Sequence, residues 1–524
     1  MSAPFAVKWI FALCPIVVVL VLMIGFRWGG GRAGAAAWFT SVAVAVILFG
    51  AGPRLLAFAQ TKGVLLALYV LYIVWMALLL YNVVNETGAI EAIGAGIQRL
   101  TGDRVIQLLI LSWVFSSFLQ GVAGFGVPIA VVAPLLIGLG FPATAAVAAP
   151  AIGHSWSVTY GDIASSFQAL IAVTGLPGEF LAHWSSVFLG VTTFLCGLAV
   201  AHLHGGMRSV RHALPAILVV GAVMAGTQYA LAAVHLWTLA GFVAGIAGMV
   251  VSAAVVRFPL YRRAVVGDAG APAGATAVRM TFGWALAAYV VLIVIVTVAE
   301  LVGPVNEALD SIALTLNFPE VRTSLGWVVP AESGKKISVF GHPGALLLYA
   351  SIASFIIYRI RGNYAPGAVS RIVSKTLASG IPTSVGIVSM VCFALTMDQS
   401  GMTFTLAEGV SKAFKGAYPL FAPAIGTLGA FMTGSNTNSN VIFGAFQQRV
   451  AELLGLSAAV ILGAQTTGGS IGSMLAPAKI LVGCSTVGLS GKEGPVLATT
   501  LRYGVAMTGL IGLLAIVLLL LGFS

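Results

Sequence analysis

A run of hydroxyl and amide side chains interrupts an otherwise apolar part of the chain. It follows Gly434 and consists of Ser435, Asn436, Thr437, Asn438, Ser439 and Asn440. Ser and Asn are poor helix formers because their side chains compete for nearby backbone groups. A bilayer tolerates uncoiled polar backbone only where it is buried in protein or lines a water-filled cavity. The run therefore predicts the tip of a re-entrant hairpin that faces a solute, with a polar surface loop as the alternative.

A second hairpin tip is predicted upstream, in the glycine-rich segment 120–128. Its candidate site residues are Gly121, Gly124 and Gly126. Glycine allows the backbone to approach a ligand closely, because it has no side chain that would hold the ligand away. Tight helix packing, for which membrane proteins often use glycine, is the alternative. Both interpretations stay open for Gly124 and Gly126, whereas Gly434 is assigned to the site.

An interrupted helix is predicted after each tip. The first break lies around 153–162 and brings His154, Ser155 and Ser157 into the candidate site. The second lies around 465–473, before Pro477, which limits helix continuation. Its candidate residues are Thr467, Gly468, Gly469, Ser470 and Ser473. Interrupted helices expose N–H groups that carry about half a positive charge, so these breaks suit an anion such as a carboxylate.

Ionisable side chains at the predicted membrane depth are functional candidates, because a charge is costly there. Asp162 follows the first break, and a carboxyl removed from water favours its neutral form, which suits a proton carrier. Its alternative role is to cap the resumed helix. His154 is either a proton relay or substrate contact, or a core histidine. Lys479 is a candidate counter-charge for a carboxylate, although we favour a side chain that extends to the cytoplasmic interface.

Composition indicates the broad class of protein. Hydrophobic residues make up 59% of the 524 residues and charged residues only 8%, whereas about 25% are charged in soluble domains. An all-α polytopic membrane protein is therefore predicted. The net charge of +11 does not indicate nucleic-acid binding, because the basic residues cluster in short loops that report topology. The four cysteines lie in or beside apolar segments without CxxC spacing, so no disulfide framework or metal site is predicted.

About twelve apolar stretches are long enough to cross a bilayer. They are predicted at 9–26, 35–52, 63–84, 145–172, 180–203, 213–234, 236–256, 281–302, 343–358, 376–397, 457–482 and 497–522. Two further stretches, 105–140 and 417–454, hold the tips and are predicted to enter and leave on one face. Alternate crossings place the basic loops 204–212, 257–263 and 359–375 on one face, which should be the cytoplasm. Both termini then lie outside.

Two segments, 62–176 and 375–489, align without a gap when 313 is added to the residue number. The register pairs Lys62 with Lys375, Glu86 with Gln399, and Gly121 with Gly434. An odd number of predicted crossings separates the segments, so the second copy is predicted to be inverted. Inverted repeats with interrupted helices in matching positions are typical of secondary transporters with a midplane site.

This organisation divides the chain into consecutive parts. They are N-terminal helices at 1–61; repeat 1 at 62–176, with hairpin 105–140 and broken helix 145–172; scaffold helices at 177–263; a linker at 264–280; scaffold helices at 281–374, with an external loop at 303–341; repeat 2 at 375–489, with hairpin 417–454 and broken helix 457–482; and a C-terminal helix at 490–524.

Three motifs resemble the lactate permease family, whose members are proton-coupled importers of small 2-hydroxy monocarboxylates. They are the segments 121–126, 434–440 and 472–480, and the resemblance covers most of the chain. More distantly, Ser435-Asn436-Thr437 is similar to the hairpin-tip motif of sodium–dicarboxylate symporters, in which two tips hold cations and a carboxylate in an elevator-type moving domain. The first tip of this chain departs from that motif, because Val122-Ala123-Gly124 has no side-chain oxygen, so protons are favoured over sodium.

Residues and resemblance together predict a secondary active transporter, not an enzyme, in the bacterial inner membrane. It is expected to import L-lactate, D-lactate or glycolate by proton symport, with the substrate held between the two tips and the two broken helices. A sodium-coupled carboxylate transporter or an inorganic-anion transporter on the same scaffold is the alternative. The sequence contains no evident catalytic grouping or phosphate-binding loop, and no cofactor is expected. The expected partners are the carboxylate, protons and lipid; a homodimer stays open.

Overall fold

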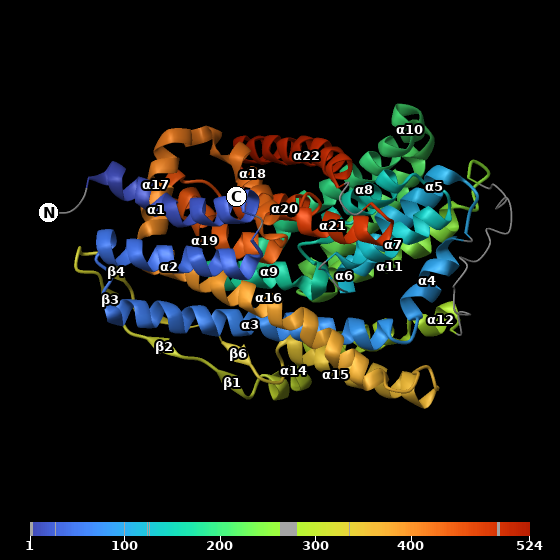
Figure 1. Ribbon diagram of the computed structural model, residues 1–524, viewed down its shortest axis with the longest axis horizontal. Helices are drawn as coiled ribbons and strands as arrows, with labels where there is room; N and C mark the ends of the chain where they lie inside the picture. Colours follow the sequence, from blue (N-terminus) through green and yellow to red (C-terminus); the bar gives the residue numbers. More distant parts are fainter. Residues whose placement is uncertain are drawn as a thin grey trace.

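The computed structural model describes residues 4–26, 28–98, 100–122, 124, 126–261, 280–334, 336–489 and 493–523. Long helices dominate it, and many of them run along the long axis of the molecule (Figure 1). Apart from Met280, the predicted linker 264–280 lies outside the described residues, and so do Ala123 and Phe125 of the first tip.

In the described part of the chain, nine helices are long and apolar enough to cross a membrane. They are α1 (Phe5–Leu20) with the π-helical turn that follows it, α2 (Gly30–Phe49), α3 (Pro53–Asn85), the segment Arg104–Val122, α10 (Gly178–Ala233), α11 (Trp237–Val255), α15 (Pro343–Ile360), α16 (Ala368–Gln399) and α22 (Gly494–Leu520). A bent pair, Ala287–Ala299 with Gly303–Leu309, adds a tenth if it is counted as one span. The predicted all-α polytopic class is confirmed.

The long helix α10 holds two of the predicted crossings. Its backbone leaves helical geometry at Gly205 and Gly206, and Gly206 has φ +62°. Glycine adopts this left-handed conformation without the steric penalty of other residues. The two arms on either side of this kink correspond to the predicted crossings 180–203 and 213–234.

Large apolar side chains are exposed on the outer helices. They include Phe39 and Ile47 on α2, Ile356 and Ile360 on α15, and Leu513 and Val517 on α22. Contiguous apolar surface of this kind is rare on soluble monomers. On a multi-pass membrane protein it faces the hydrocarbon of the bilayer.

Each predicted hairpin has two helical arms and a short tip. The first consists of α5 (Arg104–Leu109), a π-helical stretch and α6 (Ser116–Val122), followed by α7 (Val127–Gly138). The second consists of α18 (Tyr418–Thr433) and α19 (Asn436–Leu454). Gly126 and Gly434 have φ +86° and +72°, so each tip has a glycine where the chain turns in the left-handed region.

The first broken helix lies where the sequence predicts it. Helix α8 (Ala143–Gly153) is followed by a 3-10 turn at Ser155–Ser157 and then by α9 (Gly161–Thr174). Asp162, Ile163 and Ala164 all have positive φ. A left-handed conformation costs a non-glycine residue about 1–2 kcal/mol, and such strained segments concentrate at functional sites.

The predicted position of the second break was wrong. Helix α20 (Ala458–Ser473) runs unbroken through the glycine-rich segment, and α21 (Pro477–Thr486) begins after three intervening residues. The interruption is therefore at 474–476. Proline at the first helical position is tolerated because its missing N–H would have no partner there, so Pro477 marks the start of α21.

The repeat register is visible in how α3 packs on α16. Gln60 Nε2 donates to Thr396 Oγ1 (2.9 Å) near one end of the pair, and Asn82 Nδ2 donates to Thr376 Oγ1 (3.0 Å) near the other. The two helices are therefore antiparallel, as Figure 1 also shows. Short helices follow both, α4 (Ala89–Gln98) after α3 and α17 (Met402–Phe414) after α16. Antiparallel copies with the same order of elements support an inverted repeat.

Two reciprocal contacts agree with this symmetry. Lys62 Nζ donates to Gln399 Oε1 (2.8 Å), and Lys375 Nζ donates to Glu86 Oε2 (3.1 Å). Because the register pairs Lys62 with Lys375 and Glu86 with Gln399, each contact is the image of the other under a two-fold axis. Burial opposes ionisation of Glu86, but hydrogen bonds from Arg371 and Lys375 lower the pKa of this carboxyl.

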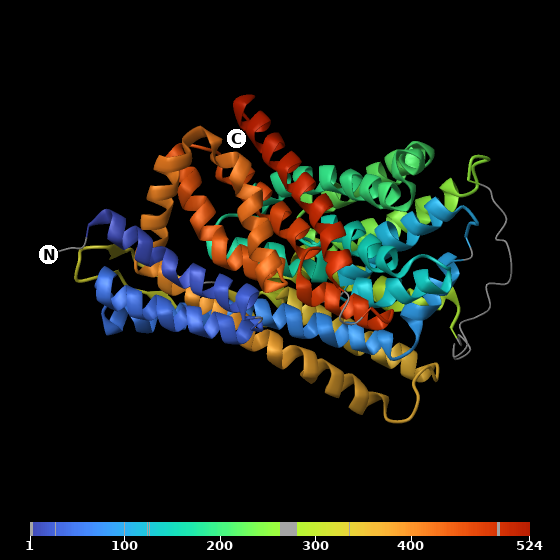
Figure 2. The ribbon, with the colours of Figure 1, turned by 45° about the horizontal axis from the view of Figure 1, so that its top comes forward.

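The predicted cytoplasmic loops lie at one end of the molecule. His212 Nε2 is 2.8 Å from Asp103 Oδ2, and Tyr261 OH donates to the His212 carbonyl (3.0 Å). The loop after α15 lies at the same end as α4 and α12 (Phe282–Ala285), opposite the N-terminus (Figure 2). Residues 204–212, 257–261 and 359–375 thus share an end, as the predicted topology requires.

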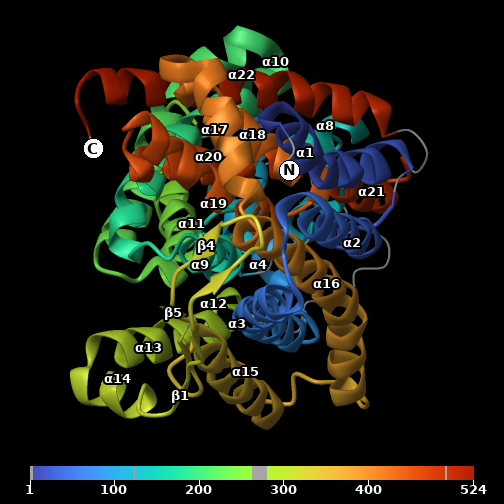
Figure 3. The ribbon, with the colours of Figure 1, turned by 90° about the vertical axis from the view of Figure 1, so that its left-hand side faces the viewer.

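The predicted external loop 303–341 has a structure of its own. It contains α14 (Gly303–Leu309) after α13 (Ala287–Leu301), and then six two-residue strands. The strands are β1 (Ala313–Leu314), β2 (Asn317–Phe318), β3 (Val321–Arg322), β4 (Val328–Val329), β5 (Glu332–Ser333) and β6 (Ile337–Ser338). They pair antiparallel as β1–β6, β2–β5 and β3–β4, which makes one long β-hairpin beside α3 (Figure 3).

Single cysteines at the starts of α3 and α16 should be labelled from opposite faces. Arg54 and Ala365 are exposed and lie at opposite ends of the antiparallel pair. In intact cells, a membrane-impermeant thiol reagent should label Arg54→Cys, whereas Ala365→Cys should react only after the membrane is opened. The parent protein with its four cysteines replaced is the control. Labelling of both variants from one face would refute the inverted orientation.

Candidate functional site

The second tip is fixed to both broken helices by a buried hydrogen-bond network. Asn436 Nδ2 donates to Thr159 Oγ1 (3.1 Å) and to the Thr466 carbonyl (3.2 Å). Asn440 Nδ2 donates to Thr466 Oγ1 (2.9 Å) and to the Ser166 carbonyl (2.9 Å). These amide groups thus hold the tip in place, because removing a buried donor leaves its partners unpaired.

The glycines of α20 allow close packing against neighbouring segments. A Cβ on Gly468 would overlap the Pro423 carbonyl of α18, and one on Gly469 would overlap the Asn436 side chain. Small residues let membrane helices approach each other closely. Gly468 and Gly469 therefore pack against α18 and the second tip and do not line an open cavity.

Several other predicted site residues are occupied by contacts within the protein. Gly121 lies in α6, where a Cβ would overlap Phe242 of α11. The hydroxyls of Ser155, Ser157 and Ser439 each donate to a backbone carbonyl at 2.8 Å. These residues support the site and do not face a solute.

Two hydroxyls of α20 lie beside the first break. Ser470 Oγ is 2.7 Å from Thr159 Oγ1. Thr467 Oγ1 is buried and has no hydrogen-bond partner among the described residues. The two sides of the candidate site, one from each repeat, thus meet through hydroxyl groups.

Lys479 is buried in the protein, which corrects the interpretation that its side chain extends to the interface. It is 7% exposed, and its ammonium group donates to Ser473 Oγ. It interacts electrostatically with both Asp162 and His154. A charge held in the protein interior without a function is costly, so Lys479 is the strongest candidate counter-charge for a carboxylate.

The first tip packs against two ionisable residues, Lys479 and Asp162. A Cβ on Gly126 would be 3.8 Å from Lys479 Cγ, and a Cβ on Gly124 would be 3.6 Å from Asp162 Cβ. The tip of repeat 1 therefore lies on α21 of repeat 2. The two glycines therefore pack against protein side chains, and the ligand-binding and packing interpretations of Gly124 and Gly126 both stay open.

Asp162 is linked to the second tip through hydroxyl groups. Ser165 Oγ donates to Asp162 Oδ2 (3.2 Å), and Thr437 Oγ1 is 3.1 Å from Ser166 Oγ and 3.4 Å from Ser165 Oγ. Asp162 Oδ1 is buried without a hydrogen-bond partner among the described residues. No side-chain cap is made at the start of α9, so the capping role is not seen and a bound proton would satisfy the free oxygen.

His154 is a fully buried histidine. Its Nδ1 is 2.5 Å from the Pro150 carbonyl, so we assign the proton to Nδ1. Nε2 has no hydrogen-bond partner among the described residues. A neutral ring with one free acceptor suits a proton relay, and the same geometry suits a core histidine.

A cavity of about 290 Å³ lies beside the second tip and Lys479. Its other wall consists of residues from the start of α2 and the middle of α16. The polar groups that line it include Thr383, Thr433, Ser435, Thr437, Asn438 and Lys479. Asn438 Oδ1 is itself buried and has no hydrogen-bond partner among the described residues, whereas Lys479 brings a cation to the cavity wall.

The electrostatics of this cavity favour an anion. Ser435, Thr437 and Asn438 belong to the N-terminal end of α19, and Lys479 belongs to the first turn of α21. Helix N-termini carry partial positive charge and bind carboxylates. Two such ends and an ammonium group at one cavity make it a candidate site for a small carboxylate.

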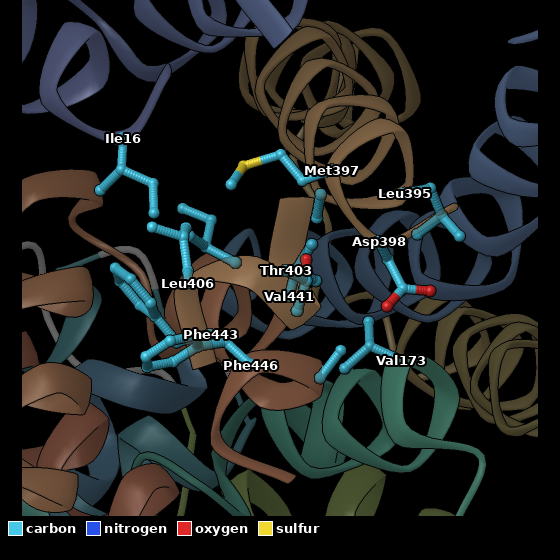
Figure 4. Close-up of a pocket in the computed structure, with 13 residues that line it drawn as sticks. Ile16, Val173, Leu395, Met397, Asp398, Thr403, Leu406, Val441, Phe443 and Phe446 are labelled. Atoms are coloured by element: carbon cyan, nitrogen blue, oxygen red, sulfur yellow. The ribbon is translucent and has the colours of Figure 1, made fainter. Parts of the chain in front are cut away.

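A smaller cavity nearby does not have this chemistry. It encloses about 30 Å³ and is lined mainly by apolar side chains from α1, α16, α17 and α19 (Figure 4). Asp398 is the one charged group on its wall. A carboxylate would find no cation there.

Sequence reasoning missed several residues that organise the site. Thr159, Ser165, Ser166 and Thr466 connect the tip to the broken helices. All four are hydroxyl residues within apolar stretches, and this feature of the sequence could have pointed to them. Ser and Thr also bond to their own helix backbone, so the residue type alone does not identify them.

The second hairpin tip and α21 line a cavity with a buried lysine, inside a bundle of helices long and apolar enough to cross a membrane. This arrangement fits a multi-pass membrane transporter. The chain belongs to the L-lactate permease family, whose family model matches residues 8–522. It is 28% identical over 504 residues to the L-lactate permease of Escherichia coli (strain K12), covering 92% of this chain and 90% of that protein. It is 26% identical over 537 residues to the Escherichia coli glycolate permease GlcA, covering 96% and 94%.

Among solved structures, the chain is similar to the Alcanivorax borkumensis YdaH transporter. The TM-score is 0.45 at 18% sequence identity, with 86% of this chain and 85% of that chain covered.

Proposed function

We propose that this protein imports a small monocarboxylate, such as L-lactate, D-lactate or glycolate, by proton symport. The observation that carries the proposal is the cavity where Lys479 meets the N-terminal ends of α19 and α21. The L-lactate and glycolate permeases among its relatives support this substrate class. A sodium-coupled carboxylate or inorganic-anion transporter on the same scaffold is the second candidate.

The substrate carboxylate is assigned to Lys479 and the two helix ends. A carboxylate that leaves water needs a cation and hydrogen-bond donors in return. The ammonium group supplies the charge, and the first turns of α19 and α21 supply backbone N–H groups.

The 2-hydroxyl of the substrate is assigned to the second tip. Ser435, Thr437 and Asn438 line the cavity, and hydroxyl and amide side chains can exchange hydrogen bonds with a substrate hydroxyl. A site built to bond a substrate hydroxyl rejects analogues that lack it. On this basis 2-hydroxy acids should be preferred over acetate or propionate.

The coupling proton is assigned to Asp162. Its carboxyl lies against the first tip, where the Gly124 backbone interacts with it, and it interacts electrostatically with Lys479. Protonation of Asp162 removes the negative charge that interacts with Lys479 and leaves the ammonium charge for the substrate. Binding of proton and substrate would thereby be coupled at one place.

Alternating access is assigned to an elevator-type movement of the tips and broken helices along α3 and α16. The substrate cavity lies between these two groups of elements. A second cavity between them, at the end that carries the β-hairpin, is lined by α3 and α16 on one side and by α9 and α19 on the other. Cavities toward both ends along one interface support such a movement.

Uptake into proteoliposomes tests the function directly. Labelled lactate and glycolate should accumulate when the outside is made acidic, because protons then flow inward with the substrate, and pyruvate, which lacks the 2-hydroxyl, should accumulate less. Accumulation should collapse with a protonophore and persist without sodium. Accumulation that requires a sodium gradient would favour the second candidate, and no uptake of any of these acids would reject the proposal.

A further inference from the structure

A cavity of about 480 Å³ lies at the end of the molecule predicted to face outside. The β-hairpin covers it through β2 and β5, and α3, α16, α9 and α19 form its walls. The hairpin is anchored beyond the cavity in both directions: Ser324 N–H donates to the Gly50 carbonyl (2.9 Å), and Tyr72 OH donates to the Val339 carbonyl (3.2 Å). The cavity therefore has a fixed roof.

Lys62 is the cation at the centre of this cavity wall. Its side chain is 8% exposed, and its ammonium group binds the Glu332 carboxylate and Gln399 Oε1 (2.8 Å). It also lies 4.9 Å from the centroid of the Phe318 ring. Phe318 and Glu332 are paired across β2 and β5, so the hairpin brings an aromatic face and a carboxylate to the same ammonium group.

The other cationic groups of this cavity have partners of their own. Arg449 pairs with Glu452 (2.7 Å) and Lys336 with Asp310 (3.4 Å). Asp398 also lines the cavity and accepts from Gln399 Nε2 (3.2 Å). Lys62 differs from these cationic groups because it lies on helix α3 and its carboxylate partner, Glu332, belongs to the β-hairpin that covers the cavity.

The repeat provides an internal comparison for Lys62. Its image, Lys375, is 53% exposed and binds Glu86, a carboxylate of helix α3 whose side chain is 10% exposed. At the image position of Glu86, the outer end has the neutral Gln399. The carboxylate that neutralises Lys62 is instead Glu332, which is 48% exposed and belongs to the hairpin. Glu332 can leave Lys62 for water without any movement of a helix.

We propose that Lys62 forms an outer binding subsite for the substrate carboxylate, and that Glu332 occupies this subsite until substrate replaces it. This inference rests on the proposed function, because the ligand is the same small monocarboxylate. The exchange replaces one carboxylate with another, so the buried ammonium group keeps an anionic partner throughout. Half-exposed ion pairs are weak, which makes the exchange reversible.

The subsite accounts for the buried lysine in the cavity wall and for the neutral groups that surround it. A buried lysine whose hydrogen-bonded carboxylate belongs to a half-exposed side chain attracts anions when that side chain turns away, even with Asp398 on the same cavity wall. The Phe318 ring and Gln399 remain in place and keep the ammonium group oriented. A carboxylate held at Lys62 would lie at the interface along which the tips and broken helices are proposed to move.

The test is the concentration dependence of uptake and efflux for Glu332→Gln. Removing the competing carboxylate should lower KM for lactate uptake about two- to sixfold, because the subsite is then always available. KM for efflux from the inside should not change. Glu320→Gln, on the same hairpin and paired with Arg322 at the surface, is the matched control and should leave both values unchanged.

Lys62→Gln completes the test. It should raise KM for uptake, and the double variant Lys62→Gln/Glu332→Gln should behave like Lys62→Gln alone. If Glu332→Gln leaves KM for uptake unchanged or raises it, the pair is a structural clamp and the subsite is rejected. If the wild-type protein transports no monocarboxylate, the proposed function has failed, which is a different result from a wild-type carrier that is insensitive to Glu332.

Discussion

Lys479→Gln is expected to weaken monocarboxylate uptake by about 30-fold to several thousand-fold. Removing one partner of a buried, hydrogen-bonded charge pair costs about 2–5 kcal/mol, and each 1.4 kcal/mol is a factor of ten in affinity. Lys479 is buried beside the cavity with two helix N-termini, so no water replaces its charge. The measurement is the concentration dependence of lactate uptake and binding.

The same substitution at a surface lysine provides the control. Lys412→Gln removes an ammonium group that is exposed and paired with Glu408, so uptake should not change. The double variant Lys479→Gln/Asp162→Asn separates two roles of Lys479. If Lys479 only balances the charge of Asp162, the double variant should regain exchange of substrate; if Lys479 binds the carboxylate, it should stay inactive.

Asp162→Asn is expected to abolish accumulation of substrate while preserving its exchange across the membrane. Asparagine imitates the protonated carboxyl, which is the form that crosses a low-dielectric region at lower cost. Wild-type uptake should rise as external pH falls, because the carboxyl must be protonated to carry substrate inward. Exchange by the variant should be independent of pH, because it has no group to titrate at this position.

Counterflow and gradient-driven uptake in the same proteoliposomes measure the two activities. Asp310→Asn, an exposed residue at the predicted outer end, is the matched control and should still accumulate substrate. Concentrative, proton-driven uptake by Asp162→Asn would contradict the assignment. The coupling proton would then have to be carried by another group, of which His154 is the first to examine.

The local features of the fold were predictable because they depend on neighbouring residues alone. The run from Ser435 to Asn440 predicted an uncoiled hairpin tip, and the structure has a tip between Thr433 and Asn436; the rest of the run, from Asn436, is already helical in α19. The first break at 154–160 was found in the same way, since small polar residues there compete with helix formation. Ten of the twelve predicted crossings fall on helices or bent helix pairs of the described chain, whereas 145–172 and 457–482 each cover two shorter helices that are not among its candidate membrane spans.

The second break was misplaced because glycine has two uses. Gly468 and Gly469 weaken a helix in isolation, which favoured a break there. In the folded chain they allow α20 to approach α18 and the second tip, and this packing keeps the helix intact. No local signal distinguishes a glycine that breaks a helix from one that lets two helices touch.

The sequence by itself determined that this is an all-α, multi-pass protein with two hairpin tips and a repeated order of elements, because apolar length, polarity and helix propensity act locally. Only the tertiary structure decided which polar groups are available to a solute. Lys479 is buried because the first tip, more than 300 residues earlier in the chain, packs on α21. Serine and asparagine side chains look equivalent along the chain. In the folded protein some of them form hydrogen bonds that hold segments together and others line a cavity, because hydrogen bonding and burial depend on contacts between distant segments.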